Sequence, residues 1–174
     1  MEPQWQDRAA GNLLDAGIQG LVVIGGDGSF RGAEELCKRG IAVAGIPGTI
    51  DNDIAGTDLT IGFRTAVETA LDAVMRLRDT ASSHDRLFIV EVMGRRSRFL
   101  ALDVAVAGGA EAVMVPEVQF SLGKLVDRLH EARRKGKTHS LIVLAEGVMP
   151  AQDLRDRIQD TAGYDARVTV LGHI

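Results

Sequence analysis

Two acid-containing, glycine-rich segments hold the residues with the clearest potential for chemistry. The first, Gly25-Gly26-Asp27-Gly28-Ser29, ends the apolar run of residues 20–25. Glycines let backbone N–H groups approach a phosphate, and the positive end of a helix near 31–39 would point at the same place. Asp27 could cap that helix or hold a Mg²⁺ ion that bridges phosphate oxygens. The segment is not a P-loop, because no Gly-Lys-Ser/Thr follows it, and alone it does not decide between these roles.

The second segment, Pro47-Gly48-Thr49-Ile50-Asp51-Asn52-Asp53, follows the next apolar run, residues 41–46. Because the carboxyl ends of parallel strands meet at one edge of a sheet, we expect Asp27, Asp51 and Asp53 to converge. Three carboxylates at one rim repel one another unless a cation lies between them. Asp and Asn also favour turns for local reasons, so ordinary turn chemistry is the alternative interpretation.

Together the two segments fit phosphoryl transfer. That reaction needs a metal site, donors for the moving phosphoryl group and a base near the acceptor hydroxyl. Asp27 could bind the metal, and Thr49 and the loop amides could contact the phosphoryl group. Asp51 could accept the proton of an attacking alcohol.

These segments require a scaffold of parallel strands, and the sequence alternates apolar runs with helical patterns. Apolar residues spaced by three and four from Phe63 to Leu77 predict one helix, and Ser121 and Gly136 are the expected N-cap and left-handed C-terminal residue of another. The apolar runs are nearly continuous, which is typical of parallel strands covered on both faces. The predicted fold is α/β, with parallel sheets in three αβα layers. The expected strands are 20–25, 41–46, 86–92, 111–115, 140–146 and 166–171.

Composition limits the function classes. The 174 residues are 45% apolar and 4% aromatic, so the core must consist mainly of aliphatic side chains. A net charge of −4 offers no general attraction for nucleic acid or an anionic membrane, and neither partner is expected. Cys37 is the single cysteine, which fits a reducing cytoplasm; we expect it to be buried on a helix. The first residues show no signal-peptide pattern, and no apolar stretch is long enough to span a bilayer.

The motifs resemble those of the bacterial ATP-dependent 6-phosphofructokinases. The resemblance extends from about Gly11 to the last residue, and the segments that carry it are GGDGS (25–29), GIPGTIDNDIAGTDLTIGF (45–63), SSHDRLFIVEVMGR (82–95), AGGAEAVMVPE (107–117), LAEGV (144–148) and RVTVLGHI (167–174). GGDGS alone also occurs in NAD kinases and in diacylglycerol-type lipid kinases, whereas PGTIDND followed by EVMGR is specific.

The resemblance implies transfer of a phosphoryl group from MgATP to the 1-hydroxyl of fructose 6-phosphate, which gives fructose 1,6-bisphosphate. It assigns ATP to Gly26, Asp27, Gly28 and Ser29, with Asp27 on Mg²⁺. It makes Asp51 the catalytic base, with Thr49 and Arg95 as further catalytic residues. The implied substrate-binding residues are Thr49, Ile50, Asp51, Arg86, Met93, Gly94, Arg95, Glu146, Arg167 and His173, and Arg86, Arg167 and His173 are expected on the 6-phosphate.

The resemblance also implies an effector site and an assembly. ADP or an inhibitory phosphorylated acid would bind between subunits, and some cationic substrate residues would come from a neighbouring subunit of a homotetramer. The alternative interpretation of the basic run 133–139 is a helix C-terminus whose cations interact favourably with the helix dipole. The implied effector residues are Arg78, Gly109, Ala110, Glu111, Lys135, Lys137, Thr138 and His139.

Two glycines bear on the phosphoryl donor. Pyrophosphate-dependent members of the family typically carry Asp in place of Gly28 and Lys in place of Gly48, where a charged side chain would crowd the nucleotide. Glycine at both positions favours ATP, and pyrophosphate remains the alternative donor.

The expected organisation is a partial ATP- and Mg²⁺-binding domain, residues 1–62, and a sugar-phosphate-binding domain, residues 63–174. Compared with the family, a leading glycine-rich nucleotide loop and the continuation after the last residue are missing. We therefore expect little kinase activity from these 174 residues alone. The alternative is a non-catalytic fragment that binds an effector or a sugar phosphate.

Overall fold

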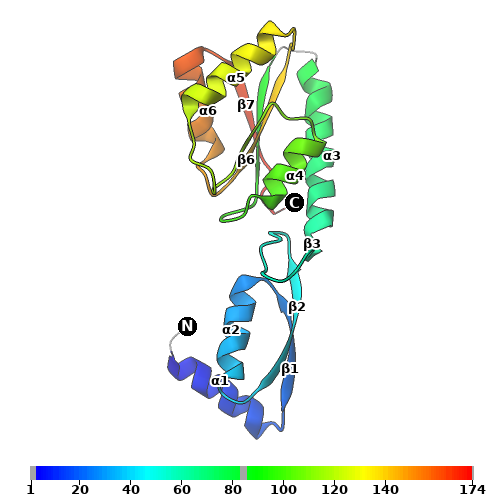
Figure 1. The fold of residues 1–174 in the computed structure, drawn as a ribbon, viewed down its shortest axis with the longest axis vertical. Coiled ribbons are helices and arrows are strands. Elements are labelled where there is room, and N and C mark those ends of the chain that lie inside the picture. The colour runs from blue at the N-terminus through cyan, green and yellow to red at the C-terminus, as the bar shows by residue number, and fades with distance from the viewer. Residues whose placement is uncertain (1–2, 83–85, 174) are drawn as a thin grey trace. The chain divides into compact units, whose positions relative to one another are not determined.

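The computed structural model describes residues 3–82 and 86–173. The chain forms two compact units, Met1–Gly62 (unit 1) and Phe63–Ile174 (unit 2) (Figure 1). Among the described residues, no helix combines the length and apolar character that crossing a bilayer requires.

Unit 1 is a three-stranded parallel sheet with two helices. Its elements are α1 (Pro3–Asp15), β1 (Gly20–Gly25), α2 (Asp27–Cys37), β2 (Ala42–Thr49) and β3 (Ile61–Gly62). The strand order is β1-β2-β3, and the register places Gly25 beside Pro47. Strands β1 and β2 therefore end at the same side of the sheet, as the sequence predicted.

The sheet of unit 1 is covered on one face. Helix α2 packs against β1 and β2, α1 packs against α2, and Figure 1 shows both helices on the same side of these strands. On the other face, Val22, Ile24 and Ile61 are 65%, 68% and 65% exposed. The expectation of strands covered on both faces is wrong for this unit, because the described residues supply helices to only one face.

Unit 2 is a three-layer αβα structure. Its parallel sheet has the order β5-β6-β4-β7. Helices α5 and α6 pack on one face in a shared apolar core, and α3 and α4 pack on the other face (Figure 1). The elements are α3 (Phe63–Ser82), β4 (Leu87–Val92), α4 (Phe99–Ala107), β5 (Ala112–Met114), α5 (Leu122–Arg134), β6 (Ser140–Ala145), α6 (Ala151–Ala162) and β7 (Ala166–Val170).

The helix signals in unit 2 behave as expected. Phe63, Ala70 and Val74 are buried along α3. The Ser121 side chain accepts the Lys124 N–H at the start of α5, and Gly136 has a φ of 85° just after its end. The N-cap and left-handed C-terminal predictions are therefore confirmed.

The expectation that Cys37 is buried is wrong, because this residue is exposed. It is the last residue of α2, where the helix runs out before the turn into β2. Ile41, only 1% exposed, is the apolar residue that is buried where the chain turns back. The end of a short helix therefore carries the cysteine out of the core.

Candidate functional site

The two chemically suggestive segments of unit 1 touch. Beyond the paired ends of β1 and β2, a Cβ placed on Gly26 would lie 3.3 Å from the Thr49 Cβ and 3.4 Å from its Oγ1. These contacts are tighter than a side chain at position 26 would ordinarily make, so the backbone of the first turn approaches the Thr49 side chain because residue 26 is glycine.

The first segment is mostly helix. Gly26 is the N-cap of α2, which begins at Asp27 and not near residue 31 as expected. A Cβ on Gly25 would lie 2.6 Å from the Ser29 Cβ, so glycine is required where the strand end meets the first helical turn. The positive end of α2 therefore lies at the strand end itself, where an anion could approach it.

Gly28 and Gly48 have different reasons to be glycine. A Cβ on Gly48 would lie 3.1 Å from the Ile24 Cγ2, so packing within the sheet already disfavours a larger residue. Around Gly28, nothing beyond its own helix comes within 4 Å of where a Cβ would stand. The open space over the first turn of α2 is therefore the feature that bears on a ligand.

Asp27 faces along its own helix. Its carboxylate pairs with the exposed Arg31 side chain at 2.6 Å and 3.2 Å, an exposed pair of the kind that contributes little to stability. Within the described residues, no group of three His, Cys, Asp or Glu side chains is placed to hold a metal ion.

The expected convergence of Asp27, Asp51 and Asp53 on one cation is therefore wrong. The reason is that α2 already begins at Asp27, so this side chain follows the helix, and Asp53 lies exposed further along its loop. One carboxylate beside a helix N-terminus still fits Mg²⁺, which commonly takes one or two protein carboxylates and several phosphate oxygens.

Asp51 lies at the start of the loop that connects β2 to β3. It is half-buried, and its N–H donates to the Thr49 Oγ1 at 3.2 Å. The same Thr49 side chain stands against Gly26, so the residue expected as base and the helix N-terminus share Thr49 as a neighbour.

Unit 2 gathers a second group of expected residues at the carboxyl ends of β4 and β6. The register pairs Val92 with Ala145, and the Glu146 N–H donates to the Val92 carbonyl at 2.9 Å. A Cβ on Gly147 would overlap the Arg95 carbonyl oxygen and lie 2.6 Å from its carbon. The loops that carry Met93, Gly94, Arg95 and Glu146 are therefore in backbone contact.

A residue that sequence reasoning missed supports this edge. Glu91, in β4, accepts the N–H of Ala151, the first residue of α6, at 2.8 Å. This bond fixes the far end of the loop that begins at Glu146. A charged residue inside the apolar strand LFIVEV was the signal that could have identified it.

Arg86 and Arg167 lie at the opposite side of the same sheet, near the amino-terminal ends of its strands. Arg86 precedes β4, and Arg167 is the second residue of the neighbouring β7. Both reach the Asp165 carboxylate, at 3.6 Å and 3.3 Å. At about 3.3 Å per residue, β4 separates Arg86 from Met93 by roughly 23 Å.

Within one chain, these two arginines therefore do not join Met93 at one sugar site. His173 follows the carboxyl end of β7 and so is also apart from them. The structure instead brings Arg86 close to Lys137 and Thr138, because all three line one small cavity of about 30 Å³.

Several expected effector residues come together between α4 and β6. The Glu111 side chain, 9% exposed, pairs with Lys137 at 2.6 Å and accepts the Leu141 N–H at 2.5 Å. Arg78 donates to the Gly108 carbonyl at 2.7 Å, and a Cβ on Gly109 would lie 3.2 Å from its guanidinium.

Another expected basic effector residue, Lys135, has a different partner. Lys135 pairs with Glu131 of α5 at 2.7 Å, and its hydrogen bond and charge hold the pKa of the Glu131 carboxyl below its usual value. Of the expected basic cluster, the structure joins Lys137 to Glu111 and leaves Lys135 on its helix.

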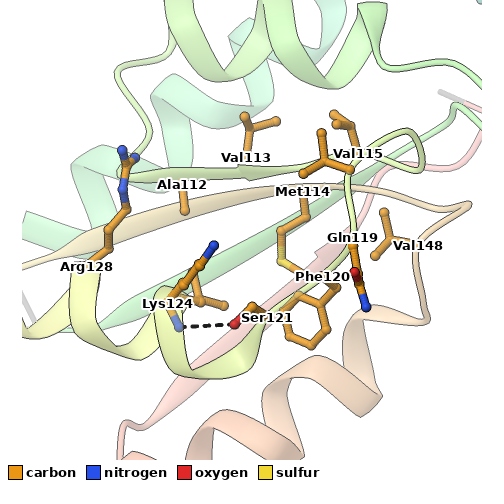
Figure 2. Close-up of a pocket in the computed structure, with 12 residues that line it drawn as sticks. Ala112, Val113, Met114, Val115, Gln119, Phe120, Ser121, Lys124, Arg128 and Val148 are labelled. Atoms are coloured by element: carbon orange, nitrogen blue, oxygen red, sulfur yellow. Dashed lines mark hydrogen bonds between the residues drawn. The ribbon is translucent and has the colours of Figure 1, made fainter.

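A larger pocket of unit 2 contains none of the expected residues. It has a volume of about 340 Å³ and lies between β5, the segment that leads to α5, and α5 itself. Figure 2 shows Lys124 and Arg128 extending from α5 towards β5, with Phe120 and Met114 among the apolar lining. No pattern in the sequence predicted this pocket.

Residues 1–174 match the family described as Phosphofructokinase. The chain belongs to the phosphofructokinase family. This match over the whole chain removes the NAD-kinase and lipid-kinase interpretations of GGDGS.

Curated relatives in the phosphofructokinase family bear the name ATP-dependent 6-phosphofructokinase. The chain is 52% identical over 169 residues to the one from Natranaerobius thermophilus, covering 97% of this chain and 53% of that protein. It is 59% identical over 157 residues to the one from Listeria welshimeri, covering 90% of this chain and 49% of that protein. The chain thus spans about half the length of the curated relatives it matches.

Solved phosphofructokinases share the fold. A crystal structure of Pichia pastoris phosphofructokinase in the T-state matches with a TM-score of 0.90 and 31% identity, over 99% of this chain and 22% of that one. A pyrophosphate-dependent phosphofructokinase from Marinobacter aquaeolei matches with a TM-score of 0.79 and 22% identity, over 98% of this chain and 48% of that one. The expectation of a phosphofructokinase-like α/β fold is confirmed.

Proposed function

We propose that this chain supplies the phosphoryl-transfer loop and sugar-binding loops of an ATP-dependent 6-phosphofructokinase. The reaction would move the γ-phosphoryl group of MgATP to the 1-hydroxyl of fructose 6-phosphate. The observation that carries the proposal is the contact between Gly26 and Thr49, which places the N-terminus of α2 beside the loop of Asp51. A helix N-terminus suits phosphate, and an adjacent carboxylate suits an attacking alcohol.

On the nucleotide side, the backbone of Gly26, Gly28 and Ser29 would face the phosphates, and Asp27 would hold Mg²⁺ by turning away from Arg31. Mg²⁺, when bound, neutralises charge on the phosphate oxygens. The open space over Gly28 supports ATP as donor, because it leaves room next to the helix for a nucleotide.

On the acceptor side, Asp51 would take the proton from the 1-hydroxyl as that oxygen forms its bond to the γ-phosphorus. The bond between this phosphorus and the bridging oxygen of ADP would break, and its electrons would leave with ADP. Thr49 would donate to the moving phosphoryl group, with Ile50 beside it. Arg95 would compensate the developing charge.

The sugar would be held by Met93, Gly94, Arg95 and Glu146, which the structure gathers at one edge of unit 2. Arg86 and Arg167 would bind the 6-phosphate of a sugar held mainly by a neighbouring subunit, because they lie at the opposite edge. This separation supports a homo-oligomer, and we propose a tetramer in the cytoplasm. His173 would serve the 6-phosphate from the carboxyl end of β7.

The effector would be ADP or another small phosphorylated molecule. Arg78 with Gly109 and Ala110, and Glu111 with Lys137, support this proposal by their proximity. Lys135, Thr138 and His139 would complete the site from the turn after α5.

The test is Asp51→Asn in the whole protein, with Asp53→Asn as matched control in the same loop. Loss of a general base is expected to lower kcat by about 10²–10⁴-fold. Fructose 6-phosphate binding, measured by calorimetry, should change far less, and the control should keep most of its turnover. Ordinary turnover in Asp51→Asn would reassign Asp51 as a structural turn residue.

A further inference from the structure

The loop that carries Asp51 is closed at its base by two polar side chains. Asn52 Oδ1 accepts the Thr60 N–H at 2.8 Å. The Thr60 hydroxyl lies 2.7 Å from the Thr49 carbonyl oxygen and 3.2 Å from Asn52 Oδ1. These contacts join the first and last residues of the 52–60 segment to each other and to the end of β2.

Each contact has a defined direction. The Thr60 hydroxyl has one hydrogen, and the shorter distance assigns it to the Thr49 carbonyl. Thr60 is only 3% exposed, so water could not replace a lost partner easily. Removal of the hydroxyl would leave the Thr49 carbonyl without this bond at a largely dry position.

Asn52 also sets the direction of the chain. Its φ of 52° is the only positive value among the described non-glycine residues. Asn tolerates this left-handed conformation better than most residues, and such conformations persist where surrounding contacts hold them. The reversal at Asn52 comes directly after Asp51, so it fixes the backbone from which the Asp51 side chain projects.

The same contacts reach the helix N-terminus. Thr49 is held through its carbonyl by Thr60, and its side chain accepts the Asp51 N–H and stands against Gly26. Displacement of Thr49 would therefore disturb both the Asp51 backbone and the N-terminus of α2 at Gly26.

We propose that Asn52 and Thr60 are positioning residues, a polar clamp that holds Asp51 and Thr49 at the α2 N-terminus. This inference rests on the proposed function for the role of Asp51. Neither residue of the clamp would need to touch the reactants, because each would act through the backbone of the 49–52 segment.

The experiment compares Thr60→Val, which removes the hydroxyl at similar volume, with Thr60→Ser, which keeps it. In the whole protein, misplacement of a reacting group is expected to lower the kcat of Thr60→Val by up to about 10²-fold. KM for fructose 6-phosphate should stay within about threefold, because most of the proposed sugar contacts, those of Met93, Gly94, Arg95 and Glu146, do not depend on this loop. Thr60→Ser, which keeps the hydroxyl, should retain most of the original kcat. If a general loss of stability caused the effect, this variant would lose turnover as well.

A second pair keeps the test valid if Thr60→Val does not fold. Asn52→Gly keeps the left-handed backbone and loses the acceptor, whereas Asn52→Asp keeps an acceptor for the Thr60 N–H. Asn52→Asp is expected to retain clearly more turnover than Asn52→Gly. Amide hydrogen exchange of residues 50–60, measured in the 174-residue chain, should rise in Thr60→Val and Asn52→Gly and stay near the original in the conservative variants.

The outcomes separate the two proposals. Wild-type kcat in both Thr60→Val and Asn52→Gly, with Asp51→Asn inactive, would overturn the clamp and keep the proposed function. Wild-type turnover in Asp51→Asn would overturn the role of Asp51, and the hydrogen-exchange comparison would then decide alone whether the clamp holds the loop. Equal exchange in all four variants would overturn it.

Discussion

In both units the proposed functional loops follow the carboxyl ends of adjacent parallel strands, but the two sheets are buried to different extents. In unit 2, β6 is buried along nearly its whole length, and Ile142 has no exposed surface. In unit 1, residues of β1 alternate between exposed and half-buried, and Ile24 is 68% exposed. Both units nevertheless end adjacent parallel strands in glycine-containing loops that carry the proposed functional residues.

This difference shows two ways of supporting an edge. The loops of unit 2 extend from a core that is covered on both faces. Those of unit 1 depend more on contacts within the edge itself, such as Gly26 against Thr49 and Thr60 on the Thr49 carbonyl. Because burial of apolar surface is the main stabilising term in folding, we expect unit 2 to be the more stable and unit 1 to open first.

The largest expected difference comes from the same substitution in the two sheets. Ile142→Ala should lower the free energy of unfolding of unit 2 by about 2–5 kcal/mol, because it leaves a cavity in a closed core. Ile24→Ala should cost unit 1 less than about 1 kcal/mol, mainly through strand propensity. Urea unfolding with hydrogen exchange resolved by unit measures both, and equal losses would contradict the comparison.

A smaller effect is expected from glycines of unit 2. Gly147→Ala places a Cβ against the Arg95 backbone and should cost about 1–3 kcal/mol by overpacking. Gly123→Ala is the matched control, because nothing lies within 4 Å there and it should stabilise helix α5 by up to about 1 kcal/mol. Thermal unfolding distinguishes them, and a neutral Gly147→Ala would mean that the two loops are not in fixed contact.

Glu91→Ala tests the support beneath the same loops. Loss of the bond to the Ala151 N–H should cost about 1–2 kcal/mol, and Glu91→Gln, which keeps an acceptor oxygen, should cost less. Hydrogen exchange at Ala151 reports the bond directly. Unchanged exchange at this amide in Glu91→Ala would remove the capping role.

The sequence was sufficient where local signals agree with packing. Continuous apolar runs located β1, β2 and β4 to β7 to within a few residues, but not the two-residue β3. Ser121 and Gly136 marked the limits of α5 because each satisfies helix-end groups locally. The placement of the two acid-containing loops at one side of a parallel sheet also followed, because the carboxyl ends of parallel strands point the same way.

The sequence was insufficient where side-chain direction or partners decide. The sequence predicts a helix near 31–39, but α2 begins at Asp27, and this earlier start turns the Asp27 carboxylate towards Arg31. Cys37 has a helical apolar position but no covering partner. The role of Glu91 depends on a helix that begins 60 residues later, which no local pattern contains.

Charged pairs near helix ends occur in both units and provide the smallest test. Lys38 pairs with Glu35 near the end of α2, and Lys135 pairs with Glu131 near the end of α5, each at 2.7 Å. In both pairs the hydrogen bond from the lysine is the main cause that holds the pKa of the carboxyl below its usual value. Such a carboxyl stabilises the folded state above its unfolded pKa, and that contribution is lost as the pH falls through the folded pKa.

Lys135→Met should therefore raise the NMR titration midpoint of the Glu131 carboxyl towards its usual value. Lys38→Met should raise that of Glu35 less, because Arg39 still donates to Glu35 at 2.9 Å. Solvent screening keeps the effects of both substitutions on stability small and similar. The greater stability of unit 2 should therefore persist as the pH is lowered. The contradicting outcome has two parts: the difference in stability between the units disappears at acid pH, and Lys135→Met removes it equally at neutral pH. Charge pairing, and not apolar burial, would then have to explain why unit 2 is the more stable.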